Sequence, residues 1–331
     1  MKIQLINKFE DIVSMENLLE AWQEFIKGKR SRQDVQEFEL NLMANIFSLH
    51  YDLVNHTYEH GDYQAFKIND PKPRNIHKAS VRDRLLHHAL YRILYPFFDK
   101  TFIADSYSCR LDKGTHKAIN RFRYLSYKTS QNRTKTAWVL KCDIRKFFAS
   151  VDQAILMEII KKYITDQDII WLISQIVFSF QSTAKGKGLP LGNLTSQLFA
   201  NVYLNQFDQF IKHKIKAKHY IRYADDFVIL SQNKKWLERI IPEIRDYLEN
   251  NLRLQLHPNK ISIKTMASGV DYLGWVNFPG HRVLRTATKR KMFRNLKAKA
   301  GNNETIQSYL GLLGHGNARK LESKISNCAI F

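Results

Sequence analysis

The spacing of hydrophobic residues predicts helices in the first hundred residues of the chain. Apolar residues recur at helical intervals from about residue 9 to 60. A second helical pattern runs from about Val81 to Phe98, with Ser80 as the expected N-cap and a stop expected near Pro96. The segment 69–74 between the two patterns is rich in turn-forming residues. The N-terminal third is therefore expected to be helical, with one interruption.

The middle of the chain alternates between predicted strands and predicted helices. An apolar run over 137–142 is expected to form a buried strand that leads into Asp143, and apolar runs on either side of Ala224-Asp225-Asp226 predict a hairpin. The other expected elements are helices over 153–180, 195–216 and 235–250, short strands near Ile261 and Tyr272, and a basic helical tail after Thr286. Strands separated by crossing helices are typical of an α+β fold with helical attachments.

Charge is the strongest feature of the composition. The 331 residues include 52 Lys and Arg against 31 Asp and Glu, a formal net charge of +21. Such an excess favours a polyanionic partner, nucleic acid above all, through phosphate contacts and counterion release. The alternative is a protein with an unspecialised basic surface. Because the basic residues are spread along the chain and do not line one amphipathic helix, no membrane-surface role is expected.

Cysteine usage and hydropathy indicate the compartment. The three cysteines, Cys109, Cys142 and Cys328, lie far apart in sequence, which argues against a disulfide framework or a zinc site. The N-terminus lacks the apolar core of a signal peptide, and the apolar run over 169–180 is too short to span a bilayer. We therefore expect a soluble cytoplasmic protein.

Acidic residues interrupt the predicted sheet at two places. Asp143 closes an apolar strand, and Asp225 and Asp226 stand at the hairpin tip, so all three are expected at one edge of one sheet. The alternative is a solvated turn, in which Asp is common. Carboxylates from two strands can hold two hard cations, which clamp the attacking and leaving oxygens of a phosphoryl transfer. Asp143 and Asp225 are expected to bridge the ions, with Asp226 less directly bound.

Sequence motifs around these acids resemble those of a known family. The segment Tyr223–Asp226 (YADD) with four apolar residues after it, preceded by 143–148 (DIRKFF), resembles the palm of a reverse transcriptase. Segment 74–84 resembles the fingers, and Leu256–Lys260 (LHPNK) and Tyr272–Trp275 (YLGW) resemble the last two palm motifs. The resemblance implies a right-hand polymerase, and we expect these parts: a helical N-terminal extension over 1–60, fingers over 61–140, a palm with an antiparallel sheet over 141–285 that includes an insertion at about 153–190, and a helical thumb over 286–331.

The loop before the 195–216 helix narrows the resemblance. In the segment 188–197 (GLPLGNLTSQ), Leu191 stands where group II intron enzymes usually carry Gln, and Gln197 stands where they usually carry Pro. This motif, together with the segment 105–116, resembles the corresponding segments of the reverse transcriptases of diversity-generating retroelements. Such enzymes copy a template-repeat RNA and misincorporate opposite adenine. A leucine offers an incoming nucleotide bulk but no hydrogen bond, which gives low fidelity a physical cause; the alternative is that Leu191 simply packs.

The resemblance also implies a set of ligands and site residues. It implies two Mg²⁺ ions, with Mn²⁺ as a substitute, held by Asp143, Ile144, Asp225 and Asp226. Nucleotide-binding residues would be Lys72, Arg74, Phe148, Leu191, Gly192 and Lys260, with Phe148 as a steric gate for dNTPs and Arg74 and Leu191 also setting fidelity. Template–primer contacts would come from Gln197, Tyr223, Leu273, Gly274, Trp275, Lys289, Arg290 and Lys291. For Phe148 the alternative is a core position, and for the basic residues it is a solvated surface.

Partners and competing functions follow from the same comparison of motifs. The expected partners are template RNA, a cDNA primer, dNTPs and a small basic helical accessory protein that forms oligomers, in a bacterial, archaeal or phage-encoded system. One alternative is another bacterial reverse transcriptase of ordinary fidelity, from a group II intron or an antiviral system. A second is a non-catalytic RNA-binding protein, which the presence of all three acids argues against.

Overall fold

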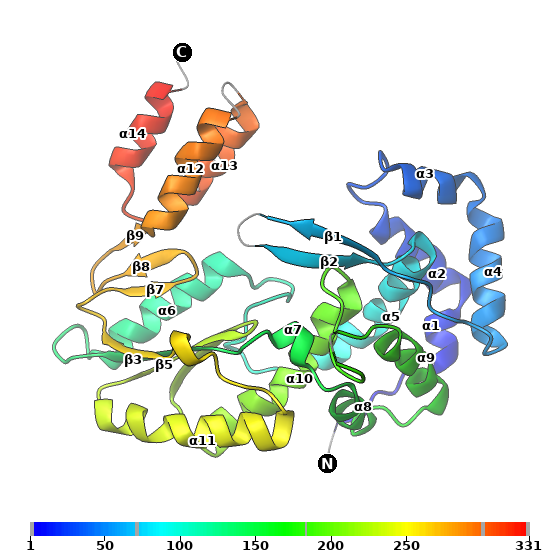
Figure 1. Ribbon diagram of the computed structural model, residues 1–331, viewed down its shortest axis with the longest axis horizontal. Coiled ribbons are helices and arrows are strands. Elements are labelled where there is room, and N and C mark those ends of the chain that lie inside the picture. The colour runs from blue at the N-terminus through cyan, green and yellow to red at the C-terminus, as the bar shows by residue number, and fades with distance from the viewer. Residues whose placement is uncertain (1–2, 70–72, 183, 299–301, 329–331) are drawn as a thin grey trace. The chain divides into compact units, whose positions relative to one another are not determined.

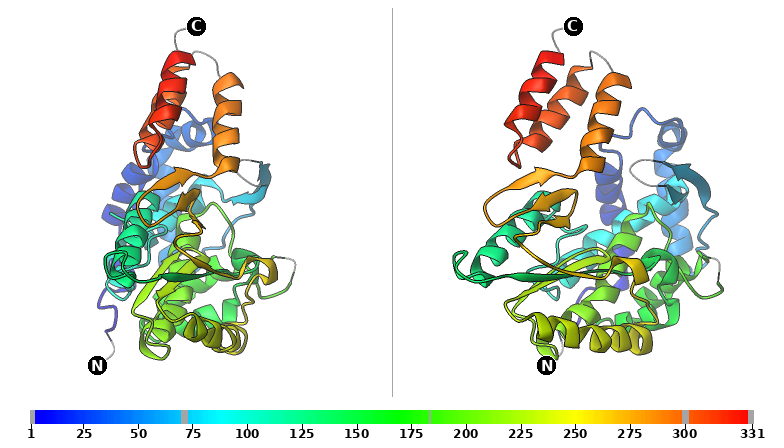
Figure 2. Two further views of the ribbon diagram at one scale, coloured as in Figure 1. Left: turned by 90° about the vertical axis from the view of Figure 1, so that its left-hand side faces the viewer. Right: turned by 60° about the vertical axis from the view of Figure 1, so that its left-hand side comes forward.

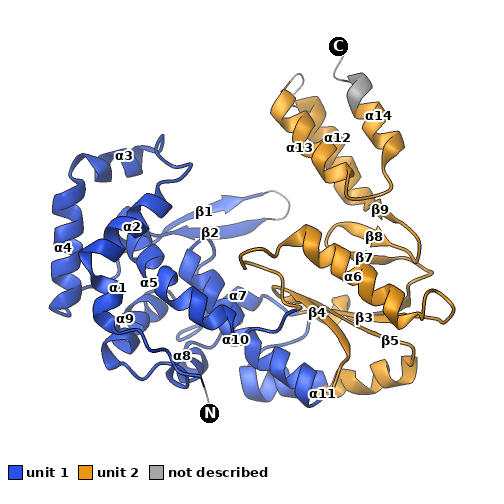
Figure 3. Cartoon of the chain, turned by 180° about the vertical axis from the view of Figure 1, so that it is seen from behind, with its two compact units in different colours: residues 1–104, 144–214, 244–256 blue, residues 105–143, 215–243, 257–331 orange. Residues whose placement is uncertain are grey.

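The chain forms two compact units that each contain several separate stretches of sequence. The computed structural model describes residues 3–69, 73–182, 184–298 and 302–328. Figure 3 colours the two units, which are described separately here: unit 1 comprises residues 1–104, 144–214 and 244–256, and unit 2 comprises residues 105–143, 215–243 and 257–331. The secondary structure confirms the prediction of an α+β fold. The predicted division into extension, fingers, palm and thumb stays a prediction.

Unit 1 begins with a group of packed helices. They are α1 (Phe9–Val13), α2 (Met15–Phe25), α3 (Gln33–Leu40), α4 (Leu42–Val54) and α5 (Val81–Asp99). Ser80 caps α5, since its side chain accepts a hydrogen bond from the Asp83 N–H. The helix ends at Asp99, one residue beyond the predicted end at Phe98, and it includes Pro96 because a proline in the last turn removes only one backbone bond. The buried faces of α2 and α5 pack together, and Trp22 and Phe25 lie in this core.

A two-stranded hairpin follows these helices in unit 1. Strands β1 (Gln64–Ile68) and β2 (Arg74–Lys78) pair antiparallel, so that the turn-rich segment near residue 70 connects them. Every residue of β1 is exposed, which explains why the sequence has no hydrophobic pattern that predicts this strand. Residues 70–72 of this segment lie outside the described part of the chain.

The rest of unit 1 is helical. It contains α7 (Phe147–Ser150), α8 (Gln153–Lys161), α9 (Gln167–Phe178), α10 (Leu194–His213) and the C-terminal end of α11 (Lys234–Leu252), which continues from unit 2. The helical pattern predicted over 153–180 is present, but it is divided into two helices. The Asp166 carboxylate accepts hydrogen bonds from the N–H groups of Asp168 and Ile169 and so starts a second helix there.

Unit 2 is built on a four-stranded antiparallel sheet. Its strands are β3 (Trp138–Asp143), β4 (His219–Tyr223), β5 (Asp226–Ser231) and β6 (Ser262–Thr265), in the order β4-β5-β3-β6. Figure 1 labels the two central strands, β3 and β5. Helix α6 (Thr115–Thr129) covers one face: Phe122 and Leu125 pack against Val139, Val228 and Leu230. These three strand residues share a face because side chains alternate along a strand. The predicted strand before Asp143 and the predicted hairpin are thereby confirmed.

A small second sheet leads into the C-terminal helices. Strands β7 (Val270–Tyr272), β8 (Trp275–Asn277) and β9 (Arg282–Leu284) form an antiparallel meander, after the short 3₁₀ helix η1 (Pro258–Lys260). Helices α12 (Thr286–Ala298), α13 (Asn303–Leu313) and α14 (Arg319–Cys328) follow, and Figure 2 shows them side by side in both views. Trp275, Met292 and Leu313 share their core. None of the helices in the described part of the chain combines the length and hydrophobicity needed to cross a membrane.

Candidate active site

Strand pairing in unit 2 brings two of the predicted acids together. Asp143, the last residue of β3, is the direct partner of Asp226, the first residue of β5. Asp225 precedes Asp226 at the hairpin tip. Directly opposed residues in an antiparallel pair have Cβ atoms about 5 Å apart. The expectation that Asp143, Asp225 and Asp226 meet at one sheet edge therefore has its basis in the register of β3 and β5.

A two-residue turn holds the hairpin tip in place. Tyr223 pairs with Asp226, so Ala224 and Asp225 form the turn, and Ala224 takes a left-handed conformation with φ of 52°. The buried Arg222 side chain donates to the Ala224 carbonyl at 3.2 Å. The turn is thus supported from inside the unit by a hydrogen bond from a buried cation.

Two lysines lie beside the acids. The Lys260 ammonium donates to both carboxylate oxygens of Asp143, at 2.8 and 2.9 Å. The Lys141 ammonium lies 3.5 Å from Asp226 Oδ2 and donates to the Asp271 carbonyl at 2.8 Å. Lys260 was expected to bind nucleotide. In this structure its ammonium neutralises Asp143, and its nucleotide role stays a prediction.

Of the three carboxyl groups, that of Asp226 lies in the environment least favourable to its ionised form. Burial is the main reason that its pKa is raised to about 6, and the nearby Asp143 and Asp225 carboxylates raise it further, while Lys141 opposes both. Its Oδ1 atom is buried and has no hydrogen-bond partner within the described part of the chain. An unpartnered buried oxygen among like charges is the environment that a bound cation would relieve.

The donor set fits a hard divalent cation. Within the described ranges, no three His, Cys, Asp or Glu side chains are grouped so as to hold a metal ion. The ligand atoms on offer are nevertheless all carboxylate oxygens, the type that Mg²⁺ and Mn²⁺ prefer. The ammonium of Lys260 occupies both oxygens of Asp143, so a cation bound there would replace one positive charge by another.

Unit 1 gathers several of the predicted nucleotide residues around one loop. The Leu191 carbonyl accepts from the His77 N–H at 2.9 Å, which ties the loop to β2. The Phe148 carbonyl accepts from the Leu189 N–H at 2.7 Å, so α7 is tied to the same loop. Gly192 has φ of +113°, and a Cβ there would lie 2.8 Å from Ile76 Cγ2. A glycine is required at this close approach.

The other predicted residues of unit 1 lie at the margins of that loop. Arg74 is exposed at the first position of β2, and Phe148 and Leu191 are half-buried. Gln197 is half-buried in the first turn of α10. Ile144 is buried at the start of the unit 1 stretch that follows Asp143. Lys72 lies outside the described residues.

The predicted template–primer residues of unit 2 differ in exposure. The Tyr223 hydroxyl is 2.9 Å from Thr115 Oγ1, and Leu273 and Gly274 form the tight turn between β7 and β8. The Trp275 ring is buried with the C-terminal helices, so this side chain supports the turn from within. The three basic residues lie in α12, where Lys289 and Arg290 are exposed and Lys291 is half-buried. Their contacts with nucleic acid stay predictions.

Lys141 and Arg222 are residues of this site that sequence reasoning missed. Lys141 stands two positions before Asp143 on the same face of β3, and a lysine inside an otherwise apolar strand was the available signal. Arg222 likewise interrupts the apolar run of β4. Lys141 lies beside Asp226, whereas the buried Arg222 guanidinium donates to the Ala224 carbonyl.

Comparison with known proteins identifies the family that the sequence resembles. The model of the Reverse transcriptase (RNA-dependent DNA polymerase) family matches residues 67–276. Protein YkfC of Escherichia coli is 26% identical over 273 residues, which cover 69% of this chain and 70% of that protein. The group II intron-encoded protein LtrA of Lactococcus lactis is 22% identical over 63% of this chain and 45% of its own length. The retron Ec73 reverse transcriptase of Escherichia coli is 30% identical over 33% of this chain and 36% of its own length.

Proposed function

We propose that this chain, which belongs to the reverse transcriptase (RNA-dependent DNA polymerase) family, copies a template-repeat RNA into cDNA with low fidelity at template adenines, as the polymerase of a diversity-generating retroelement. RNA-directed DNA synthesis is the activity of the family, and relatives include group II intron and retron proteins. The α+β arrangement agrees with the right-hand polymerase fold of that family. The template, the low fidelity and the retroelement are the proposed parts.

The cluster of three aspartates at the end of the sheet supports the proposed chemistry. Each step would join the primer 3′-oxygen to the α-phosphorus of a dNTP and release pyrophosphate. We propose that Asp143, Asp225 and Asp226 hold two magnesium ions. Such a pair supplies charge neutralisation at the attacking and leaving oxygens. The chain itself contributes three carboxylates fixed by strand register, with Lys260 and Lys141 balancing the charge of Asp143 and Asp226.

The single observation that carries the low-fidelity proposal is the side chain of Leu191. It has no polar group, and its own backbone is fixed by the bond from His77 to its carbonyl. The Asn193 amide also donates to the His77 carbonyl at 3.0 Å, so the loop is held on both sides of Gly192. A rigid loop that presents an aliphatic side chain can exclude volume, but it cannot select a nucleotide by hydrogen bonding.

Magnesium-dependent copying of an adenine-rich RNA template, with sequencing of the products, tests the proposal. We expect wild-type errors to concentrate opposite template adenines, and the Leu191→Gln variant to make fewer of them at a similar rate of synthesis. The matched control is Leu194→Gln, a half-buried leucine in the first turn of α10. Faithful copying by the wild-type protein, supplied with its cognate RNA and any small basic accessory protein, would overturn it.

A second candidate is a reverse transcriptase of ordinary fidelity. The similarity to LtrA and to the retron enzyme favours it, since both names describe bacterial systems with other roles. The same sequencing experiment separates the two candidates. Under this alternative, errors would be rare and evenly spread over the four template bases, and Leu191→Gln would leave their distribution unchanged.

A further inference from the structure

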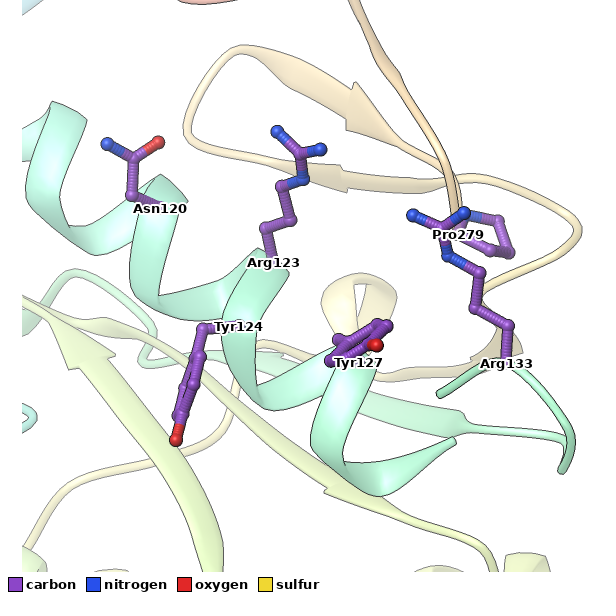
Figure 4. Close-up of a pocket in the computed structure, with 6 residues that line it drawn as sticks. All are labelled: Asn120, Arg123, Tyr124, Tyr127, Arg133 and Pro279. Atoms are coloured by element: carbon purple, nitrogen blue, oxygen red, sulfur yellow. The ribbon is translucent and has the colours of Figure 1, made fainter. Parts of the chain in front are cut away.

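Unit 2 has a hollow on the outer side of α6, away from the carboxylates. Its volume is about 370 Å³, and its lining consists of basic, aromatic and amide side chains with one proline (Figure 4). The lining residues are Asn120, Arg123, Tyr124, Tyr127, Arg133 and Pro279. Arg133 precedes the start of β3, whereas Asp143 ends that strand. Five residue steps of about 3.3 Å therefore separate the two ends by about 17 Å.

The sequence builds this hollow from one helix face and one loop. Positions 120, 123, 124 and 127 are spaced at i, i+3, i+4 and i+7, so they lie on one face of α6. The loop after α6 folds back on the helix end, since the Asn132 N–H donates to the Tyr127 carbonyl at 3.0 Å and the Arg133 N–H donates to Ser130 Oγ at 3.0 Å. Arg133 thus reaches the segment of Pro279 and Gly280.

The charged residues that line the hollow, Arg123 and Arg133, are both positive. Residues 113–142 contain eight Lys and Arg and no Asp or Glu, and residues 272–303 show the same count. Neither the Arg123 nor the Arg133 guanidinium is paired with a carboxylate in the described ranges. Nearby, Arg282 donates to Asn120 Oδ1 at 2.8 Å, but its buried Nη1 atom has no partner in the same described residues. Arg123, Arg133 and Arg282 therefore form a cluster of cations with no carboxylate partner among the described residues.

Two tyrosines stand exposed among these cations. Tyr124 is 48% exposed and Tyr127 is 42% exposed, although both rings are large and partly apolar. Arg121 and Lys128 lie over the Tyr124 ring at 5.2 and 5.7 Å, and Arg133 lies 5.9 Å from the Tyr127 ring centre. Arg121 is itself paired with Asp105, so Arg123 and Arg133 are the arginines left for phosphates. Exposed rings interleaved with cations are typical of surfaces that bind single-stranded nucleic acid, with bases on the rings and phosphates on the cations.

We propose that the outer face of α6 is a second binding site for single-stranded nucleic acid, separate from the catalytic carboxylates. Arg123 and Arg133 contact phosphates there, and Tyr124 and Tyr127 stack on bases. Such a site would hold a part of the template RNA that is not being copied. It rests on family membership alone, and it stands or falls independently of the fidelity of copying.

The test compares two primer–template duplexes by fluorescence anisotropy with the full chain. One is a short RNA–DNA duplex, and the other carries an added 20-nucleotide single-stranded RNA extension of mixed sequence. We expect the extension to tighten wild-type binding by about tenfold or more, and Arg123→Glu with Arg133→Glu, or Tyr124→Ala with Tyr127→Ala, to remove that gain. The charge-matched control is Lys235→Glu with Arg239→Glu on the exposed side of α11, which should keep the gain.

Extension of the short duplex at saturating protein serves as the folding check and should be unchanged in every variant. A DNA extension of the same sequence tells whether the site prefers RNA. An equal gain in the wild-type protein and in both α6 variants would overturn the proposal. So would an equal loss in the α11 control, because the effect would then be one of net charge.

Discussion

At the scale of single residues, the Asp226 carboxyl links the stability of the fold to its chemistry. Its pKa is raised from 3.8 to about 6, first by burial and then by the neighbouring carboxylates. Because the folded pKa lies above the unfolded one, the protonated form stabilises the fold below about pH 4, and this stabilisation is lost as the pH rises through 6. At neutral pH the ionised carboxylate therefore opposes folding.

Replacing Asp226 with Asn should remove this cost. We expect Asp226→Asn in EDTA to be more stable than the wild-type protein at pH 7.5, by up to about 3 kcal/mol, since one pKa unit corresponds to about 1.4 kcal/mol. The difference should shrink as the pH falls below 6. Thermal unfolding of both proteins between pH 5 and 8 measures it, and a variant that is less stable at pH 7.5 would contradict the account.

The residues of the site were predictable to different degrees. Asp143, Asp225 and Asp226 could be found because each interrupts or ends an apolar strand. The ion pair of Lys260 with Asp143 joins residues 117 positions apart, and no local pattern indicates such a contact. Trp275 shows the opposite case, since its motif suggested a primer contact, whereas its ring is buried in the core.

At the scale of elements, hydrophobic spacing predicted those that bury one face. Helix α5, helix α10 and strands β3 to β5 are of this kind, and their expected and observed ranges agree to within a few residues. Strands β1 and β8 were missed for different reasons. Strand β1 is exposed along its length, and β8 is three residues long, too short to show a period.

The bond between β2 and the Leu191 loop can be tested through Gly192. An alanine at Gly192 would be strained at φ of +113°, and its Cβ would press on Ile76. We expect Gly192→Ala to destabilise the protein by about 1–3 kcal/mol and to raise the KM for dNTPs. The control is Gly186→Ala, which has a positive φ but nothing within 4 Å. Equal effects at both positions would show that only backbone strain matters.

The packing of the C-terminal helices can be tested through two glycines. A Cβ at Gly316 would overlap the Trp275 ring, whereas a Cβ at Gly311, inside α13, would meet nothing within 4 Å. We expect Gly316→Ala to destabilise the protein by about 1–3 kcal/mol. Gly311→Ala should instead stabilise it by about 0.5–1 kcal/mol through helix propensity. Chemical denaturation gives both values, and effects of the same sign would argue against the burial of Trp275.

At the scale of the whole molecule, the net charge of +21 should govern binding to nucleic acid. For single strands, the logarithm of the binding constant falls with the logarithm of salt concentration by about 0.7 for each phosphate contact. We expect a slope of about −4 or steeper for single-stranded RNA, equivalent to six or more contacts. Fluorescence anisotropy from 50 to 300 mM KCl measures this slope. A slope near zero would mean that the basic residues do not contact phosphates.

The central claim is that the Asp143, Asp225 and Asp226 carboxylates carry RNA-directed DNA synthesis, and primer extension on an RNA template tests it most directly. With Mg²⁺ and four dNTPs, the wild-type protein should extend the primer, and Asp143→Asn and Asp225→Asn should each slow extension by about 100-fold or more. Asp246→Asn, an exposed acid on α11, should have no effect. Extension by the Asp143 and Asp225 variants at the wild-type rate would contradict the account.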